Sequence, residues 1–306
     1  MLHIPTPTYH SAVLSDYTGQ EIYLKMESYQ PTGSFKIRGI GRLCEHLANE
    51  GIKHFVSSSG GNAGVAAAYA GRQLGIPVDV YLPSTANAIY VKAITLQGAT
   101  THVAGDVWDD AHEHALQAAQ APDTGYIPPF DHPLLWSGHA TMIEEVHAAG
   151  IKPDAVLVAV GGGGLCCGVL QGMNQVGWSD IPVFTVETEG AASFAQSVKQ
   201  QRHITLERID TIATTLGAKR VCDALWTWRL RHPIKPLTVT DAQEVAAISR
   251  FANDHRTLLE PAGAAVMVPI YQKIPALVGF RSILVIVCGG IGISLSLLAE
   301  WQRRFE

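Results

Sequence analysis

Two apolar runs of strand length end at clusters of glycine, and this arrangement constrains the fold more than any other feature of the chain. Residues 155–160 (AVLVAV) lead into residues 161–164 (GGGG), and residues 283–287 (ILVIV) lead through Cys288 into Gly289 and Gly290. A segment compatible with a helix follows each cluster. Strands that are apolar throughout are typical of parallel sheets covered by helices on both faces. The glycine breaks disfavour membrane-spanning helices at both places.

The same alternation of strand and helix patterns continues along the chain. Strands are predicted at residues 21–26, 54–58, 78–82, 100–103, 155–160, 182–187 and 283–287. Helices are predicted at residues 34–48, 62–75, 108–121 and 241–254, with Ser34 placed to cap the first. This order indicates βαβ units and hence an α/β protein with parallel sheets. The 306 residues suffice for two domains, with residues 126–133 (YIPPFDHP) as the best crossing between them.

Charge and cysteine usage exclude several classes of protein. The chain carries 22 Lys and Arg against 27 Asp and Glu, so its formal net charge is −5, and a general nucleic-acid binder is not expected. The first residues lack the basic and apolar regions of a secretory signal, which favours a cytoplasmic protein with no membrane attachment. The five cysteines have neither the spacing of a disulfide framework nor that of a structural zinc site.

The four glycines at residues 161–164 lie between a predicted strand and a predicted helix. Their backbone N–H groups and the helix N-terminus favour binding of an anion such as a phosphate. No Gly-Lys-Ser/Thr follows, so this is not a Walker A loop, and Cys166 or Cys167 stands where a dinucleotide fingerprint requires its third glycine. Close packing without a ligand remains the alternative reading.

Two further segments favour ligand binding. Residues 57–64 (SSSGGNAG) place hydroxyls, an amide and free N–H groups between a strand and a helix, which suits a carboxylate, although an ordinary capping loop has the same composition. Lys36, in PTGSFKIRG, begins an otherwise apolar helix. A partly desolvated lysine at a helix N-terminus has a lowered pKa and becomes a usable nucleophile, whereas most lysines there are solvated.

Taken in order, these motifs resemble the fold-type II enzymes of pyridoxal 5'-phosphate (PLP), and specifically the short, catabolic L-serine/L-threonine dehydratases. The resemblance is carried by YLKMES, SFKIRG, SSSGGNAG, IPPFDHPLLWSGHA, GGGGL, VETEGAASF, LLEPAGAA and VCGG, spread over nearly the whole chain. It implies a tryptophan synthase β-like fold of two parallel-sheet α/β domains with the cofactor between them. Residues 34–128 would form the small domain, and residues 1–33 and 129–306 the large one.

The resemblance also implies a role for individual residues. Lys36 would form the Schiff base with the cofactor and take the α-proton of the substrate. The other cofactor contacts would be Phe35 at the ring, Asn62 at the 3'-oxygen, Cys288 at the pyridine nitrogen, and Gly161, Gly162, Gly163, Gly164 and Leu165 at the phosphate. The substrate carboxylate would meet Ser59, Gly60, Gly61, Asn62 and Ala63. A monovalent cation, potassium in the first instance, would bind Glu187, Ala191, Ser193, Leu216 and Ala218.

The implied reaction is the dehydration and deamination of L-serine, and of L-threonine, to a 2-oxo acid and ammonia, catalysed by a homodimer. Several relatives carry alanine where this chain has Gly60, and the missing methyl group could widen the pocket and change the preference between serine and threonine. Cysteine synthase-like β-replacement, serine racemisation and non-catalytic binding of the cofactor are the alternatives.

Overall fold

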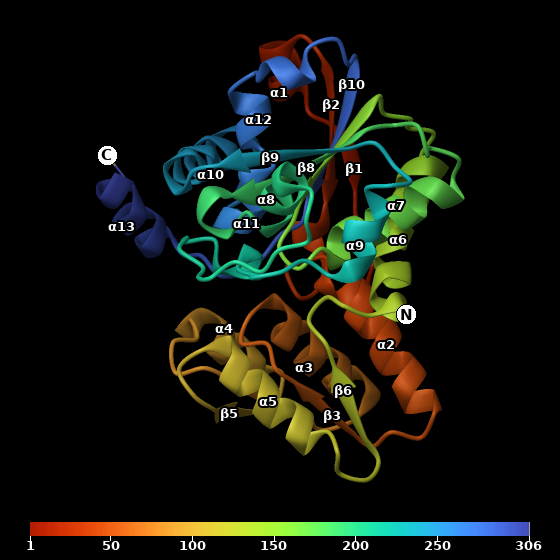
Figure 1. Ribbon diagram of the computed structural model, residues 1–306, viewed down its shortest axis with the longest axis vertical. Helices are drawn as coiled ribbons and strands as arrows, with labels where there is room; N and C mark the ends of the chain where they lie inside the picture. The colour runs from red at the N-terminus through yellow and green to blue at the C-terminus, as the bar shows by residue number, and fades with distance from the viewer. Residues whose placement is uncertain (306) are drawn as a thin grey trace.

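Two sheets organise the chain in the computed structural model, which describes residues 1–305 (Figure 1). The larger has the strand order β1-β2-β10-β7-β8-β9 and the smaller the order β5-β4-β3-β6. The larger sheet comprises β1 (Thr8–His10), β2 (Glu21–Met26), β7 (Ala155–Ala159), β8 (Val183–Thr188), β9 (Ile234–Val239) and β10 (Ser282–Val287). The smaller comprises β3 (His54–Ser57), β4 (Val78–Leu82), β5 (Thr100–Val103) and β6 (Thr124–Ile127). Every pairing is parallel except that of β1 with β2, so the predicted α/β class is confirmed.

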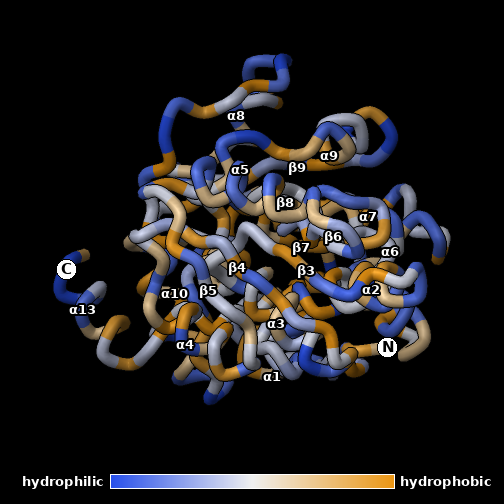
Figure 2. Tube along the Cα trace, turned by 90° about the horizontal axis from the view of Figure 1, so that it is seen from below, coloured by the Kyte–Doolittle hydropathy of each residue, from blue (hydrophilic) through white to orange (hydrophobic). Residues whose placement is uncertain are grey.

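Three of the four interior strands of the larger sheet are buried along their whole length. Every residue of β7, β8 and β10 is buried, as expected for parallel strands covered on both faces. In Figure 2 the hydrophobic parts of the trace concentrate toward the middle of the body, around β7 and β3, whereas outer loops are hydrophilic. The carboxyl ends of β7 and β10 therefore meet within the core, where the glycine clusters follow.

Helices cover both sheets and connect them. They are α1 (Ala12–Thr18), α2 (Lys36–Asn49), α3 (Asn62–Leu74), α4 (Ala88–Leu96), α5 (Trp108–Ala118), α6 (Pro133–Ala148), α7 (Gly164–Gln175), α8 (Ser193–Gln200), α9 (Asp223–Trp228), α10 (Asp241–His255), α11 (Pro261–Ala265), α12 (Val268–Tyr271) and α13 (Leu295–Phe305). In Figure 1, α3, α4 and α5 surround the smaller sheet in the lower half of the molecule, and α13 projects from the side. None of these helices, among residues 1–305, is long and apolar enough to cross a membrane.

A buried ion cluster holds the start of α2 against the larger sheet. The Arg38 guanidinium, fully buried, donates two hydrogen bonds of 2.7 and 2.8 Å to Glu27, next to β2, and two of 2.6 and 2.8 Å to Glu145 of α6. Lys25 of β2 also donates to Glu145. Charged groups removed from water need partners of this kind, and the paired fork of Arg38 sets the orientation of the first turn of α2. Lys36 is the first residue of that turn.

The structure corrects two details of the sequence analysis. Ser34 does not cap α2: the residue at the N-cap is Phe35, and Ser34 instead pairs with Gly289 in an isolated bridge. Strands β1, β6 and β9 were not predicted from the sequence. Each lies at the edge of its sheet and exposes part of its residues, so the hydrophobic signal is weak, and β9 even contains Pro236.

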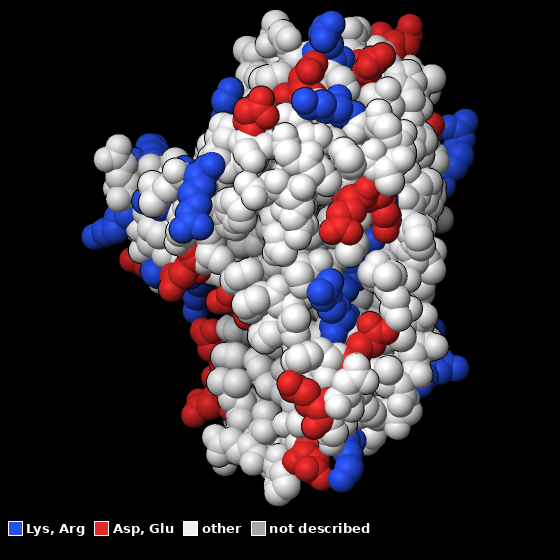
Figure 3. Space-filling view, turned by 90° about the vertical axis from the view of Figure 1, so that its right-hand side faces the viewer, with Lys and Arg blue, Asp and Glu red and all other residues white. Residues whose placement is uncertain are grey.

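Acidic and basic side chains are mixed on the surface shown in Figure 3, with wide uncharged areas between them. Charge of one sign does not dominate this face.

Candidate active site

A small cavity of about 50 Å³ lies where the two sheets face each other. It is lined by Phe35, Lys36, Asn62, Phe130, Ala159, Gly161, Gly162, Gly163, Gly164, Leu165, Thr215, Leu216, Glu260, Ala262, Cys288 and Gly289. Most of these residues come from the starts of α2, α3, α7 and α11 and from the carboxyl ends of β7 and β10; Phe130 precedes α6, and Thr215 and Leu216 lie in the 3₁₀ turn Thr214–Leu216. The cavity therefore occupies the position where ligands of open α/β sheets bind.

Lys36 reaches this cavity from the N-terminus of α2. Its amine donates a hydrogen bond of 2.5 Å to the carbonyl oxygen of Pro129 and lies 5.1 Å from the centre of the Phe35 ring. Burial lowers the pKa of Lys36 to about 8, although Cys288 and Glu260 act in the opposite direction. An amine with this pKa is unprotonated about a tenth of the time at pH 7 and about half of the time at pH 8, far more often than an ordinary lysine, so it can act as a base or nucleophile.

The glycine run forms a tight turn that leads into α7. Gly163 is the N-cap and has a φ of +94°, a conformation that favours glycine, and its position offers no side-chain cap. A Cβ on Gly162 would lie 2.4 Å from the ring of Phe130, so no larger residue fits there. Among residues 1–305, the N–H groups of Gly161, Gly162 and Gly163 have no hydrogen-bond acceptor. Together with the N-terminus of α7 they form a cradle for an anion.

The loop between β3 and α3 approaches the cavity from the smaller sheet. Asn62 begins α3 and lines the cavity, whereas Ser59, Gly60, Gly61 and Ala63 lie beside it and do not line it. The Ser59 hydroxyl accepts a hydrogen bond from the N–H of Gly61 at 3.3 Å. A Cβ on Gly60 would lie 3.0 Å from Leu82 Cβ and 3.2 Å from that of Ala86, away from the cavity.

Cys288 follows β10 and is 4 % exposed. Its thiol donates to the carbonyl oxygens of Ala262 and Gly289, each at 3.7 Å. Burial, with a further contribution from Glu260, raises the pKa of Cys288 to about 12, so the thiol is neutral at physiological pH.

The residues predicted for a cation are spread over three neighbouring segments. Glu187 is the penultimate residue of β8 and is fully buried, and its carboxylate accepts hydrogen bonds from the N–H groups of Phe194 at 2.8 Å and Ala195 at 2.7 Å. Burial raises the pKa of Glu187 to about 8. The buried hydroxyl of Ser193 has no partner among residues 1–305. Ala191 lies in the 3₁₀ turn Glu189–Ala191, and Leu216 ends the turn Thr214–Leu216, just before Ala218.

Six residues that line the cavity were not predicted as site residues from the sequence: Phe130, Ala159, Thr215, Glu260, Ala262 and Gly289. The carboxylate of Glu260 is 2 % exposed and accepts hydrogen bonds from Asn62, Tyr90, Thr215 and the N–H of Gly292. Burial raises the pKa of Glu260, and these four hydrogen bonds oppose the shift. The sequence held one signal for Glu260: it is the only acid in the apolar segment LLEPAGAA. A carboxylate buried there needs hydrogen-bond donors from other segments, which indicates a polar cluster.

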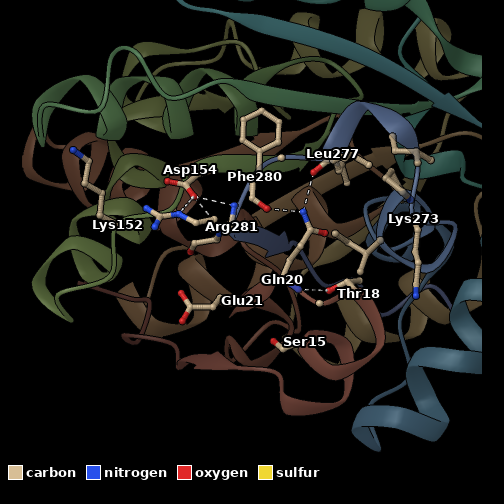
Figure 4. Close-up of a pocket in the computed structure, with 17 residues that line it drawn as sticks. Ser15, Thr18, Gln20, Glu21, Lys152, Asp154, Lys273, Leu277, Phe280 and Arg281 are labelled. Carbon is tan, nitrogen blue, oxygen red and sulfur yellow. Dashed lines mark hydrogen bonds and ion pairs between the residues drawn. The ribbon is translucent and has the colours of Figure 1, made fainter.

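A larger cavity, of about 1040 Å³, lies at the opposite ends of β2 and β10 (Figure 4). Asp154 there accepts hydrogen bonds from the N–H groups of Arg281 and Ser282, and Gln20 donates to the carbonyl oxygens of Leu277 and Phe280. The side chains of Asp154 and Gln20 are thus engaged in holding loops together. Lys36 and the glycine cradle line the small cavity, which is therefore the candidate active site.

Comparisons with known proteins agree with this assignment. The model of the family described as "Pyridoxal-phosphate dependent enzyme" matches residues 1–289. The human protein named L-serine dehydratase/L-threonine deaminase is 45 % identical over 99 % of this chain and 95 % of its own length. The L-serine dehydratase of Dictyostelium discoideum is 42 % identical over 96 % of this chain and 90 % of its own length. A crystal structure of a fungal L-serine ammonia-lyase from Rhizomucor miehei has a TM-score of 0.94 at 34 % identity and covers 100 % of this chain and 99 % of its own.

The chain therefore belongs to the family of pyridoxal-phosphate dependent enzymes. This confirms the fold-type II architecture, with two parallel-sheet α/β domains, that the sequence motifs implied.

The residues of the small cavity fit such a cofactor. A desolvated amine at Lys36 suits its aldehyde, the unpartnered N–H groups of residues 161–163 suit its phosphate, and a Cβ in the cradle would clash with its wall. No cluster of three or more His, Cys, Asp and Glu side chains able to hold a metal ion occurs in the described part of the chain.

Proposed function

We propose that this protein is an L-serine/L-threonine ammonia-lyase, converting L-serine to pyruvate and ammonia and L-threonine to 2-oxobutanoate and ammonia. It is a PLP-dependent enzyme, like the named dehydratases that match nearly all of its length. The observation that carries the proposal is the buried Lys36 amine, with its lowered pKa, beside a glycine cradle whose N–H groups are free.

The site residues predicted from the sequence motifs each have a proposed function in this reaction. The amine of Lys36 would hold the aldehyde of the cofactor until the amino group of the substrate takes its place. The freed amine would then accept the α-proton of the amino acid, for which a pKa of about 8 is suitable. The N–H groups of Gly161, Gly162, Gly163, Gly164 and Leu165 bind the phosphate, and Asn62 donates to the ring oxygen. Phe35 packs beside the ring. When bound, the cofactor withdraws electrons from the Cα–H bond of the substrate.

The substrate carboxylate is proposed to bind in the loop of Ser59, Gly60, Gly61, Asn62 and Ala63. Support comes from the position of Asn62 inside the cavity and from the nearby N-terminus of α3, which has no side-chain cap. Cys288, as a neutral thiol at the ring nitrogen, would moderate the electron withdrawal and favour elimination over side reactions.

The direct test is turnover by the purified, PLP-saturated protein with L-serine, L-threonine and D-serine. We expect pyruvate and 2-oxobutanoate with equimolar ammonia from the two L-amino acids. D-serine appearing from L-serine would indicate a racemase, a relevant arm because maize serine racemase has a TM-score of 0.89 at 25 % identity. Little pyruvate from serine alone, but S-alkylated products with a thiol, would indicate β-replacement.

Four finer points are proposals as well. A monovalent cation such as potassium would bind Glu187, Ser193 and the carbonyl oxygens of Ala191, Leu216 and Ala218, supported by the unpartnered, buried Ser193 hydroxyl.

Residues 34–128 would form the small domain and residues 1–33 and 129–306 the large one, supported by the location of β3 to β6 within residues 54–127. A cytoplasmic location is proposed as well, because the five free thiols agree with a reducing compartment. The protein is also proposed to be a homodimer, which analytical ultracentrifugation tests.

A further inference from the structure

Glu260 receives four hydrogen bonds at the edge of the cavity. Its Oε1 accepts from the Asn62 amide and the Thr215 hydroxyl, both at 2.8 Å. Its Oε2 accepts from the Tyr90 hydroxyl at 2.5 Å and from the N–H of Gly292 at 3.0 Å. A carboxylate has about four lone-pair sites, so this group is saturated with donors.

The four donors belong to both halves of the molecule. Asn62 begins α3 and Tyr90 lies in α4, two helices that pack around the smaller sheet. Thr215 lies in the turn Thr214–Leu216 and Gly292 follows β10, on the side of the larger sheet. One buried carboxylate thus links the two domains beside the catalytic cavity.

The contact also determines how the Asn62 amide is turned. Asn62 donates from Nδ2 to Glu260, and its Oδ1 accepts from the N–H of Ile291 at 3.3 Å. The nitrogen of an amide carries two hydrogens. When one amide hydrogen of Asn62 binds Glu260, the direction of the second hydrogen is set as well. The flipped amide is excluded, because it would place Asn62 Oδ1 against Glu260 Oε1.

The glycines after β10 make room for this arrangement. A Cβ on Gly290, whose φ is +133°, would lie 1.8 Å from the carboxyl carbon of Glu260. A Cβ on Gly292 would lie 2.2 Å from the Tyr90 hydroxyl oxygen. Both positions exclude side chains because the Glu260 cluster occupies the space.

We propose that Glu260 is a positioning residue, which joins the two domains across the site and turns the Asn62 amide toward the ring oxygen of the cofactor. The inference rests on the proposed function in one respect, the role of Asn62 as a cofactor contact. It adds a residue that acts through Asn62.

The decisive variant is Glu260→Gln, which has nearly the same volume. Its side-chain nitrogen must replace either Oε1, facing the Asn62 amide nitrogen, or Oε2, facing the Gly292 N–H. Either orientation sets two donors against each other. Glu244→Gln is the matched control, since Glu244 is also fully buried but lies in α10, does not line the cavity and has no hydrogen-bond partner among residues 1–305.

The readouts are the dissociation constant for PLP and the position of the visible absorbance band of the loaded protein. We expect Glu260→Gln to bind PLP roughly tenfold to a hundredfold more weakly, the size of effect of one lost charged hydrogen bond, and to shift the band. Glu244→Gln should change neither. These measurements need the cofactor but no turnover, so a protein that loads PLP and fails to deaminate serine would refute the proposed function without altering this test.

Tyr90→Phe separates the link between domains from the orientation of Asn62. It removes one donor from the α4 side only, so we expect faster hydrogen exchange in Ala88–Leu96 with an unchanged absorbance band. A folded Glu260→Gln protein with wild-type PLP affinity and band position would overturn the proposal. So would a variant whose melting temperature falls while both cofactor readouts stay as in wild type, because that is the behaviour of a purely structural residue.

Discussion

The backbone N–H of Phe35 donates a hydrogen bond of 3.0 Å to the carbonyl oxygen of Cys288. This contact joins the residue before α2 to the residue after β10, so the Lys36 amine and the Cys288 thiol open onto the same cavity. The N–H of Gly290 reinforces the junction by donating to the carbonyl oxygen of Gly33 at 2.8 Å. The proposed nucleophile is thus held by backbone bonds as well as by the ion cluster of Arg38.

Replacing Lys36 by alanine should reduce pyruvate formation from L-serine by roughly a hundredfold to ten-thousandfold, the usual contribution of a positioned acid–base group. The measurement is steady-state turnover at saturating PLP. Lys53→Ala is a suitable control, because Lys53 is exposed and pairs only with Asp123 at the surface. Near-normal turnover by Lys36→Ala would remove Lys36 from the mechanism.

The lowered pKa of Lys36 predicts how pH affects cofactor capture by the apoprotein. Only the unprotonated amine attacks an aldehyde, so the rate of PLP capture should rise about tenfold per pH unit below pH 7, reach half of its maximum near pH 8 and level off at about pH 9. Stopped-flow absorbance measures this rate. A rate that continues to climb beyond pH 9 would show that the Lys36 pKa is not lowered.

At Cys288 we expect opposite effects from two substitutions. Cys288→Ser keeps a small neutral donor and should retain substantial activity, whereas Cys288→Asp places a second carboxyl group close to the buried Glu260 and should lose most of it. PLP occupancy and melting temperature are measured beside activity, with Cys44→Ser, at a buried cysteine outside the cavity, as the control. A fully loaded, stable Asp variant with wild-type elimination would show that Cys288 has no electronic role.

The proposed cation predicts that activity is higher in potassium than in tetramethylammonium buffer, and that Glu187→Ala loses this difference. Glu187 also binds two N–H groups at the start of α8, so its removal should cost about 1 kcal/mol of stability, as for a lost helix cap. Activity is therefore compared at a temperature where both proteins are folded. Equal wild-type activity in the two buffers would eliminate the cation.

Gly60→Ala tests whether the missing methyl group sets the choice of substrate. The added Cβ would point at Leu82 and Ala86, outside the cavity. We therefore expect a changed KM for both amino acids, but a threonine-to-serine ratio of kcat/KM within roughly threefold of wild type, whereas a methyl group inside a substrate pocket typically changes such a ratio about tenfold or more. A larger change in the ratio would place Gly60 in the specificity pocket.

The sequence by itself determined the fold class and the positions of the chemistry-bearing motifs. Strands such as β7 and β10 are apolar throughout because both faces are buried, and their glycine turns mark the carboxyl ends where a ligand binds. The glycines of residues 161–164 were found in this way, whereas the role of Lys36 was predicted from the resemblance of the ordered motifs to a known family. Strands β1, β6 and β9 were missed because they lie at sheet edges and are partly exposed, and β1 and β6 are also short, which weakens the local pattern.

Only the tertiary structure decided how the motifs meet and which unmarked residues join them. Glu260 binds Asn62, Tyr90, Thr215 and Gly292, which are scattered over most of the chain, and none of these pairings has a local signature. The direction in which a Cβ on Gly60 would point depends on packing, and so does the burial that lowers the Lys36 pKa. Periodicity reports the environment along one strand or helix, whereas desolvation and hydrogen bonds between domains depend on which distant segments pack together.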